Sequence, residues 1–308
     1  MMIPMKSRTN LEKKSEIKSP AIKTLKALVL VPMAVIASTG VSLALPPTTS
    51  PELAPHRAVY EMKLGEADEN SGIIAVKGRM VFEFQGNHCD GYTQNMRFVT
   101  EITDKRGTST LTDLRTSNWE DGAGARFRFN SQHYRDRNLK EIIKGDAKRD
   151  SKMSAVNVAL FKPSKQKLTL KDQVFFPNQH SVELLKSAMA GKTILQARIY
   201  DGSEKGRKVF NTTSIIGKEG VSNKPSPFPN VANAERLEGV ASWPVAISYF
   251  EDGTASGEEL PVYELAFRFY ANGVSRNLLI NYGDFTIRGI LKEIEFYKLD
   301  ACTDSAKN

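Results

Sequence analysis

The sequence has few of the residues and motifs on which enzymes and metal proteins depend. It contains two cysteines and four histidines, and no His-x-x-x-His or His-Glu-x-x-His spacing of a metal site. It also lacks a Gly-x-Ser-x-Gly nucleophile motif, a glycine-rich phosphate loop, and a Ser-x-x-Lys motif followed by Lys-Thr-Gly. The histidines are His56, His88, His133 and His180. We therefore predict no catalytic residue, no metal site and no cofactor.

Polar residues that could form a site are present but lack a distinctive pattern. Glu120-Asp121-Gly122 and the pair Asp113 and Arg115 are candidates, for which we expect turn and surface roles. His56 begins the first expected strand, and we interpret it as a structural residue. No ligand-binding residue can be named from these patterns.

No apolar run is as long as the roughly 20 residues that a membrane helix needs. The apolar run Ala27–Ala37 is about half that length and follows a basic segment, Met1–Lys26, and a weaker uncharged stretch continues to Leu45. Small residues then occupy Ser42 to Ala44. This order is typical of a secretory signal peptide, so we predict cleavage after Ala44, with the alternative of an uncleaved membrane anchor. The basic segment is long, and translation could begin at Met5 instead.

Most of the positive charge belongs to this segment. Residues 1–44 carry seven basic and two acidic side chains, a net +5 of the +8 of the whole chain, which leaves +3 for residues 45–308. The basic clusters that remain are short and interrupted. The high isoelectric point is therefore no evidence for nucleic-acid binding.

The two cysteines, Cys89 and Cys302, lie near opposite ends of the exported part of the chain. An exported protein enters an oxidising compartment, where an even number of cysteines is expected to pair. We predict a disulfide between an early strand and the last residues of the fold. The alternative is two unrelated buried thiols. A disulfide would make thiol chemistry between Cys89 and its neighbour His88 unavailable.

Apolar and polar residues alternate along the chain with the period of half-buried antiparallel strands. Clear examples are Tyr60–Leu64, Met80–Phe84, Tyr92–Phe98, Ala125–Phe129 and Tyr263–Phe269. Asp-Gly and Asn-Gly pairs between such runs are typical of hairpin turns. About 260 residues remain after the signal, which one all-β barrel or sandwich domain can contain.

One segment has helical spacing instead. His180–Gly191 places Val182, Leu185, Ala188 and Met189 on one face, with Asn178 or Ser181 as its start and Gly191 as its end. We expect this helix to lie against the concave face of a curved sheet. Asn223–Asn230 is rich in proline and is expected to be a loop, and Asp150–Lys167 remains unassigned.

Aromatic residues are frequent in or beside the expected strands. Most should be core, and some could line a cavity for an acyl chain or a peptide, but the sequence does not separate the two roles. They are Trp119, Phe127, Phe129, Tyr134, Trp243, Tyr249, Phe250, Phe267, Phe269, Tyr270, Phe285 and Phe296.

Eight segments in the same order resemble the EipB family, periplasmic cell-envelope integrity proteins of Gram-negative bacteria that were long described as a domain of unknown function. The resemblance extends from about Pro55 to Cys302. The segments are Pro55–Tyr60, Gly78–Phe84, Cys89–Tyr92, Asp113–Thr116, Phe175–His180, Ile199–Ser203, Pro261–Glu264 and Gly273–Arg276.

The resemblance implies a mainly β fold, in which a long antiparallel sheet curls into an open barrel, or β-spiral, with one helix at its concave side. It implies a disulfide between an early strand and the C-terminal end, for which the matching positions are Cys89 and Cys302. The sheet is similar to those of periplasmic lipoprotein carriers and of a sensor of envelope stress. No enzymatic activity defines the family.

From the resemblance we expect residues 45–308 to form a single β-spiral domain in the periplasm. The expected function is non-enzymatic maintenance of the cell envelope, as a monomer, by binding a lipid, a lipoprotein, a peptide or a partner protein. We expect no nucleic-acid partner and no stable membrane insertion after signal cleavage. The alternatives are an enzyme that modifies envelope polymers through an unrecognised site, and a purely structural protein with a filled barrel.

Overall fold

The computed structural model describes residues 51–152, 154–221, 231–252, 260–299 and 302. The predicted signal peptide, residues 1–44, and the expected loop at 223–230 lie outside this described part of the chain. All of the described residues belong to one compact unit.

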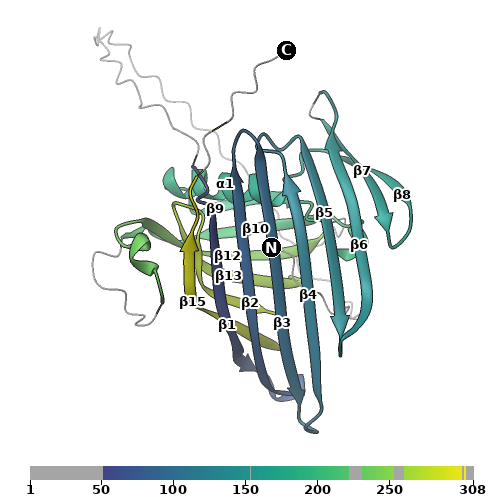
Figure 1. Cartoon of the computed structure of the whole chain (residues 1–308), viewed down its shortest axis with the longest axis vertical. Helices are drawn as coiled ribbons and strands as arrows, with labels where there is room; N and C mark the ends of the chain where they lie inside the picture. Colours follow the sequence, from purple (N-terminus) through teal and green to yellow (C-terminus); the bar gives the residue numbers. More distant parts are fainter. Residues whose placement is uncertain (1–50, 153, 222–230, 253–259, 300–301, 303–308) are drawn as a thin grey trace, which may run out of the picture. The chain divides into compact units, whose positions relative to one another are not determined.

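The first half of the described chain is a series of antiparallel hairpins in which each strand pairs with the next. Figure 1 shows β1 to β6 in this order. The strands are β1 (His56–Ala67), β2 (Ile73–Asn87), β3 (Gly91–Asp104), β4 (Ser109–Glu120), β5 (Arg126–Arg135), β6 (Asn138–Arg149), β7 (Ala155–Lys162) and β8 (Gln166–Lys171).

The second half of the chain adds strands to the same sheet on the free side of β1. The last strand, β15, pairs with β1, so strands from the two ends of the fold meet inside the sheet, and β8 and β9 end the strand path. The strands are β9 (Ile194–Ile199), β10 (Phe210–Ile216), β11 (Gly220–Val221), β12 (Ala241–Glu251), β13 (Tyr263–Tyr270), β14 (Ser275–Asn281) and β15 (Phe285–Phe296). Three short 3₁₀ turns are η1 (Glu69–Ser71), η2 (Glu204–Gly206) and η3 (Ala234–Leu237).

The prediction of a mainly β fold is confirmed: fifteen strands form one antiparallel sheet that is not closed. The alternating pattern identified strands correctly because it reflects burial of one face. In β1, for example, Tyr60 and Met62 are buried, whereas Lys63 is exposed. The stretch that the sequence left unassigned contains β7 and the start of β8.

The sheet curls so that one face encloses the main core. Four strands separate β2 from β12 in the sheet, which would place them about 24 Å apart if the sheet were flat. Phe84 of β2 and Tyr249 of β12 nevertheless belong to the same core cluster and line the same cavity. A smaller second cluster, with Phe127, Phe129 and Tyr200, lies on the β5–β8 side.

The helix α1 (Pro177–Met189) connects the β8 side to the β9 side and contacts β9. Its end was predicted correctly, because Gly191 has a positive φ of 70° and the Lys192 N–H donates to the Ser187 carbonyl, as in a Schellman motif. Its start was not: the helix begins at Pro177, three residues before His180.

The buried face of α1 also differs from the expected one. Leu184 and Leu185 are buried, but Met189 is 48% exposed. The buried face of the helix therefore includes Leu184, which was not expected, and excludes Met189, which was. Leu185 and Ala188 of the expected face are buried as predicted.

Candidate functional site

A cavity of about 120 Å³ lies between the curled sheet and α1. Its walls come from both halves of the sheet, namely β1, β2 and β3 on one side and β12, β13 and β14 on the other, with the first turns of α1. The volume is similar to that of an engineered apolar cavity of about 150 Å³ that binds benzene. In this conformation the cavity can therefore hold a small group or the end of one chain.

Most of the cavity wall is apolar. Met80 and Phe84 line it from β2, and Leu265, Phe267 and Phe269 line it from β13. Rings stack or meet edge to face along each strand, with 5.4 Å between the centroids of Phe267 and Phe269. Of the aromatic residues singled out in the sequence, Tyr249, Phe267 and Phe269 line the cavity. Such walls favour an apolar occupant.

The start of α1 adds polar groups to this wall. Asn178, His180 and Ser181 line the cavity together with Gln94 of β3, whose Nε2 donates to the Asn178 Oδ1 at 2.7 Å. The Ser181 hydroxyl donates to the Pro177 carbonyl at 3.0 Å. The cavity thus has a polar group of side chains next to the helix, whereas Asn272 and Ser275 add polar residues near the β13–β14 turn.

His180 differs from its polar neighbours. It is 5% exposed, and its Nε2 has no hydrogen-bond partner among the described residues. Burial lowers the pKa of His180 to about 4, so the imidazole is neutral at pH 7. Buried polar atoms in native proteins are usually paired, so an unpaired ring nitrogen beside a cavity suggests a partner supplied by a ligand.

His56 also lines the cavity, but its role is the structural one expected from the sequence. Its Nδ1 lies 2.7 Å from the Ala54 carbonyl, and burial lowers its pKa. Asp201, after β9, completes the polar side, and its Oδ1 accepts the Ser203 N–H at 2.9 Å. Among the described residues that line the cavity there is no lysine or arginine. An anionic group placed inside would have no cation to pair with.

A buried carboxylate holds the start of α1 against the sheet. Glu120, at the end of β4, accepts the backbone N–H groups of Asn178 and Gln179 at 2.8 Å each. Burial raises the pKa of Glu120 to about 8, against the lowering effect of these two donors and of Arg149. Arg149 donates to the Gln179 Oε1 at 2.6 Å and stacks on Phe176. The polar side of the cavity is positioned through this contact.

Sequence reasoning gave Glu120 a turn or surface role, and this was wrong, since it is 2% exposed. A signal was available in the strand pattern. Leu114, Thr116, Asn118 and Glu120 are spaced by two and are all buried, so Glu120 continues the inward face. What that face would meet could not be read from β4 itself.

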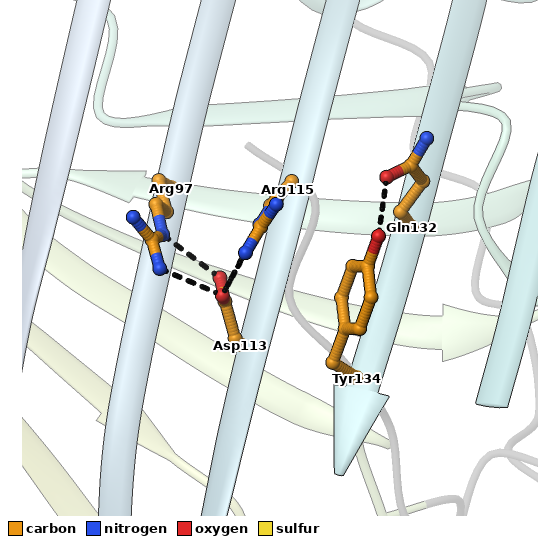
Figure 2. A network of polar contacts seen from close by, with 5 residues as sticks. All are labelled: Arg97, Asp113, Arg115, Gln132 and Tyr134. Carbon is orange, nitrogen blue, oxygen red and sulfur yellow. Dashed lines mark hydrogen bonds and ion pairs between the residues drawn. The ribbon is translucent and has the colours of Figure 1, made fainter. Parts of the chain in front are cut away.

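The pair Asp113 and Arg115 forms an ion-pair network across strands β3 and β4 rather than a catalytic site (Figure 2). The Asp113 carboxylate contacts Arg97 at 2.9 Å and Arg115 at 2.7 Å. Burial acts to raise the pKa of Asp113, but Arg115 and Arg97 outweigh it and hold the pKa below its usual value. Tyr134 lies beside this network, and its hydroxyl donates to the Gln132 Oε1. Asp113 thus separates two arginines that are direct cross-strand neighbours.

Cys89 and Cys302 form a disulfide with a Cα–Cα distance of 5.6 Å. It joins the β2–β3 turn, rather than a strand, to the segment after β15. The His88 Nε2 lies 3.7 Å from the Cys302 Sγ. These three side chains bring nitrogen and sulfur atoms within 4.8 Å of one another, but the disulfide uses both sulfurs. His133 lies on β5, apart from this group and from the cavity lining.

Within the described part of the chain, no helix has the length and apolar character required to cross a membrane.

The comparisons with known proteins agree with the observed sheet. The EipB-like family model matches residues 47–298. The chain is 37% identical over 256 residues to the cell envelope integrity protein EipB of Brucella abortus (strain 2308), covering 83% of this chain and 86% of that protein.

A solved structure gives the same result for the fold. The crystal structure of a beta-barrel-like protein of the domain of unknown function DUF1849 from Brucella abortus superposes with a TM-score of 0.73 at 37% identity, covering 80% of this chain and 99% of that one. The chain therefore belongs to the EipB-like family.

Proposed function

We propose that this protein acts in the periplasm to maintain the cell envelope, and that it does so by holding an acyl chain of an envelope lipid or lipoprotein in the cavity beneath α1. The observation that carries this proposal is the apolar cavity enclosed by both halves of the sheet, in a chain related to a cell envelope integrity protein. The protein works as a monomer and as a binding protein rather than an enzyme.

The lining favours an acyl chain over a peptide. Aromatic and aliphatic side chains form most of the wall, and burying each methylene against them contributes about 0.8 kcal/mol. A peptide in the same place would bring backbone N–H and C=O groups that need partners, and most polar atoms of the lining are already bonded to the protein. A chain longer than the cavity requires α1 to move outward.

The lining also weighs against an enzyme. A hydrolytic site needs a nucleophile bonded to a base that a third group orients. His180, Ser181 and Asp201 all line the cavity, but the Ser181 hydroxyl bonds to Pro177 and Asp201 accepts from Ser203. Both side chains therefore bond to nearby backbone groups, and neither bonds to His180 as a catalytic triad would require.

A cavity-filling variant tests the proposal. Ser181→Phe places a ring where the half-buried serine lines the cavity, and Lys186→Phe, on an exposed position of the same helix, is the matched control. We expect wild type and Lys186→Phe to bind a fluorescent acyl-chain probe and to restore detergent and cell-wall antibiotic resistance to a deletion strain. Ser181→Phe should do neither. The proposal is wrong if a folded Ser181→Phe variant binds the probe and restores resistance like wild type.

A further inference from the structure

Among the described residues that line the cavity, His180 has a fully buried side-chain nitrogen, Nε2, without a hydrogen-bond partner. Leaving such an atom unpaired costs about 1–3 kcal/mol. A ligand that supplies a hydrogen bond to it recovers this cost, whereas a purely apolar ligand does not.

Several other polar groups of the wall already have partners within the protein. Asn178 is bonded to Gln94, Ser181 to Pro177, and Asp201 to the Ser203 N–H. The Tyr60 hydroxyl donates to the Ser275 carbonyl at 2.7 Å. His180 differs from these groups, because its buried Nε2 has no partner among the described residues.

The charges around the cavity restrict that chemistry. No lysine or arginine is present among its described lining residues, and Asp201 contributes a carboxylate. A buried anion without a cation costs far more than a buried neutral polar group. A free carboxylate or a phosphate is therefore disfavoured here, although either could remain outside while a chain enters.

From this arrangement we propose that the cavity selects the uncharged part of an acyl lipid, a chain that carries a hydroxyl, ester or amide group, and that His180 is the hydrogen-bond partner of that group. The inference rests on the proposed acyl-chain binding and adds its specificity. A neutral imidazole suits such a group, since its Nε2 can accept from a hydroxyl or amide N–H, or donate to an ester or amide carbonyl. Because Glu120 anchors the start of α1, the ring is held in place at the cavity wall.

Matched dodecyl compounds test the inference. Dodecanol, dodecanamide and dodecanoate have the same chain and differ in the terminal group, so each can be titrated against a bound fluorescent acyl-chain probe on lipid-free protein at pH 7.5. We expect dodecanol and dodecanamide to displace the probe at concentrations at least about tenfold lower than dodecanoate. The reason is that dodecanoate would bury a charge without a cation to pair with it.

Variants of His180 then assign the effect to the ring. His180→Phe has a similar shape and no hydrogen-bonding atom, so it should weaken dodecanol binding about tenfold. His180→Gln keeps a donor and an acceptor and should retain most of the preference. His88→Phe, at an exposed histidine outside the cavity, is the matched control.

The outcomes separate the two proposals. If dodecanoate binds as tightly as dodecanol, or if a folded His180→Phe variant keeps the wild-type preference, the inference is overturned while acyl-chain binding stands. If no dodecyl compound displaces the probe, and the probe itself does not bind, the proposed function fails as well.

Discussion

The Glu120 Oε2 lies 2.8 Å from the backbone nitrogen of Asn178, a residue 58 positions later in the chain. The second carboxylate oxygen accepts the Gln179 N–H, so one side chain from the end of β4 satisfies two of the backbone donors that the start of α1 leaves free. Burial raises the pKa of Glu120 to about 8, although these two N–H donors favour its ionised form. The sheet therefore positions the helix that carries His180 through this contact.

Replacing Glu120 should destabilise the protein and loosen the helix. Glu120→Ala leaves two buried N–H groups without a partner, for which we expect a loss of about 2–4 kcal/mol in the free energy of unfolding. Urea unfolding measures the loss, and hydrogen exchange at Asn178 and Gln179 should become faster. Glu101→Ala, at an exposed glutamate of β3, is the control. Equal stability of the two variants would show that the contact contributes nothing.

Removing the disulfide should lower stability through the unfolded state. The bridge closes a loop with a sequence separation of 213 residues, and a loop of this size corresponds to about 5 kcal/mol in the chain-entropy model. We expect Cys89→Ser and Cys302→Ser to lower the melting temperature by similar amounts and to increase protease sensitivity. The double variant should be no worse than either single one. Thiol labelling that finds both sulfurs free in protein from the periplasm would contradict this prediction.

His180 should contribute a loss of stability as the pH falls below neutral, whereas Glu120, with a folded-state pKa of about 8, contributes in the opposite direction. Its folded-state pKa of about 4 is below the unfolded value near 6.5, so the unfolded chain binds more protons between these values. The contribution of His180 to the free energy of unfolding is therefore complete above pH 6.5. It decreases by up to about 3 kcal/mol as the pH falls to 4.

Thermal unfolding measured from pH 7.5 to pH 4 checks this dependence. His180→Phe cannot take up a proton, so the difference in stability between wild type and this variant should shrink as the pH falls from 7.5 to 4. Glu120 and His56 contribute to both proteins alike and cancel in this difference. Parallel pH profiles of wild type and His180→Phe would rule out the assignment to His180.

Much of the fold could be predicted from sequence because strand patterns are local. Tyr60, Met62 and Leu64 alternate with charged residues whatever the rest of the chain does, since one face of a strand is buried. The end of α1 at Gly191 was equally clear, since a glycine with a positive φ ends helices by a local rule. The order of eight segments then identified the family.

The site depended on contacts between distant segments. Glu120 continues the inward-facing positions of β4, but its partners are backbone groups of a helix 58 positions later in the chain, which the pattern of β4 does not identify. Similarly, the sequence could not separate Phe267, which lines the cavity, from Phe127, which packs in the second core cluster. Both belong to alternating strands with the same local appearance.

The sequence by itself thus determined many of the strands, the approximate position of one helix and the two cysteines available for pairing. Tertiary structure decided which side chains meet. Only the curl of the sheet brings β2 and β12 to one cavity, beside which the His180 Nε2 has no partner among the described residues. The reason is that strand formation depends on the alternation of neighbouring residues, whereas a cavity depends on how a long sheet closes over its own face.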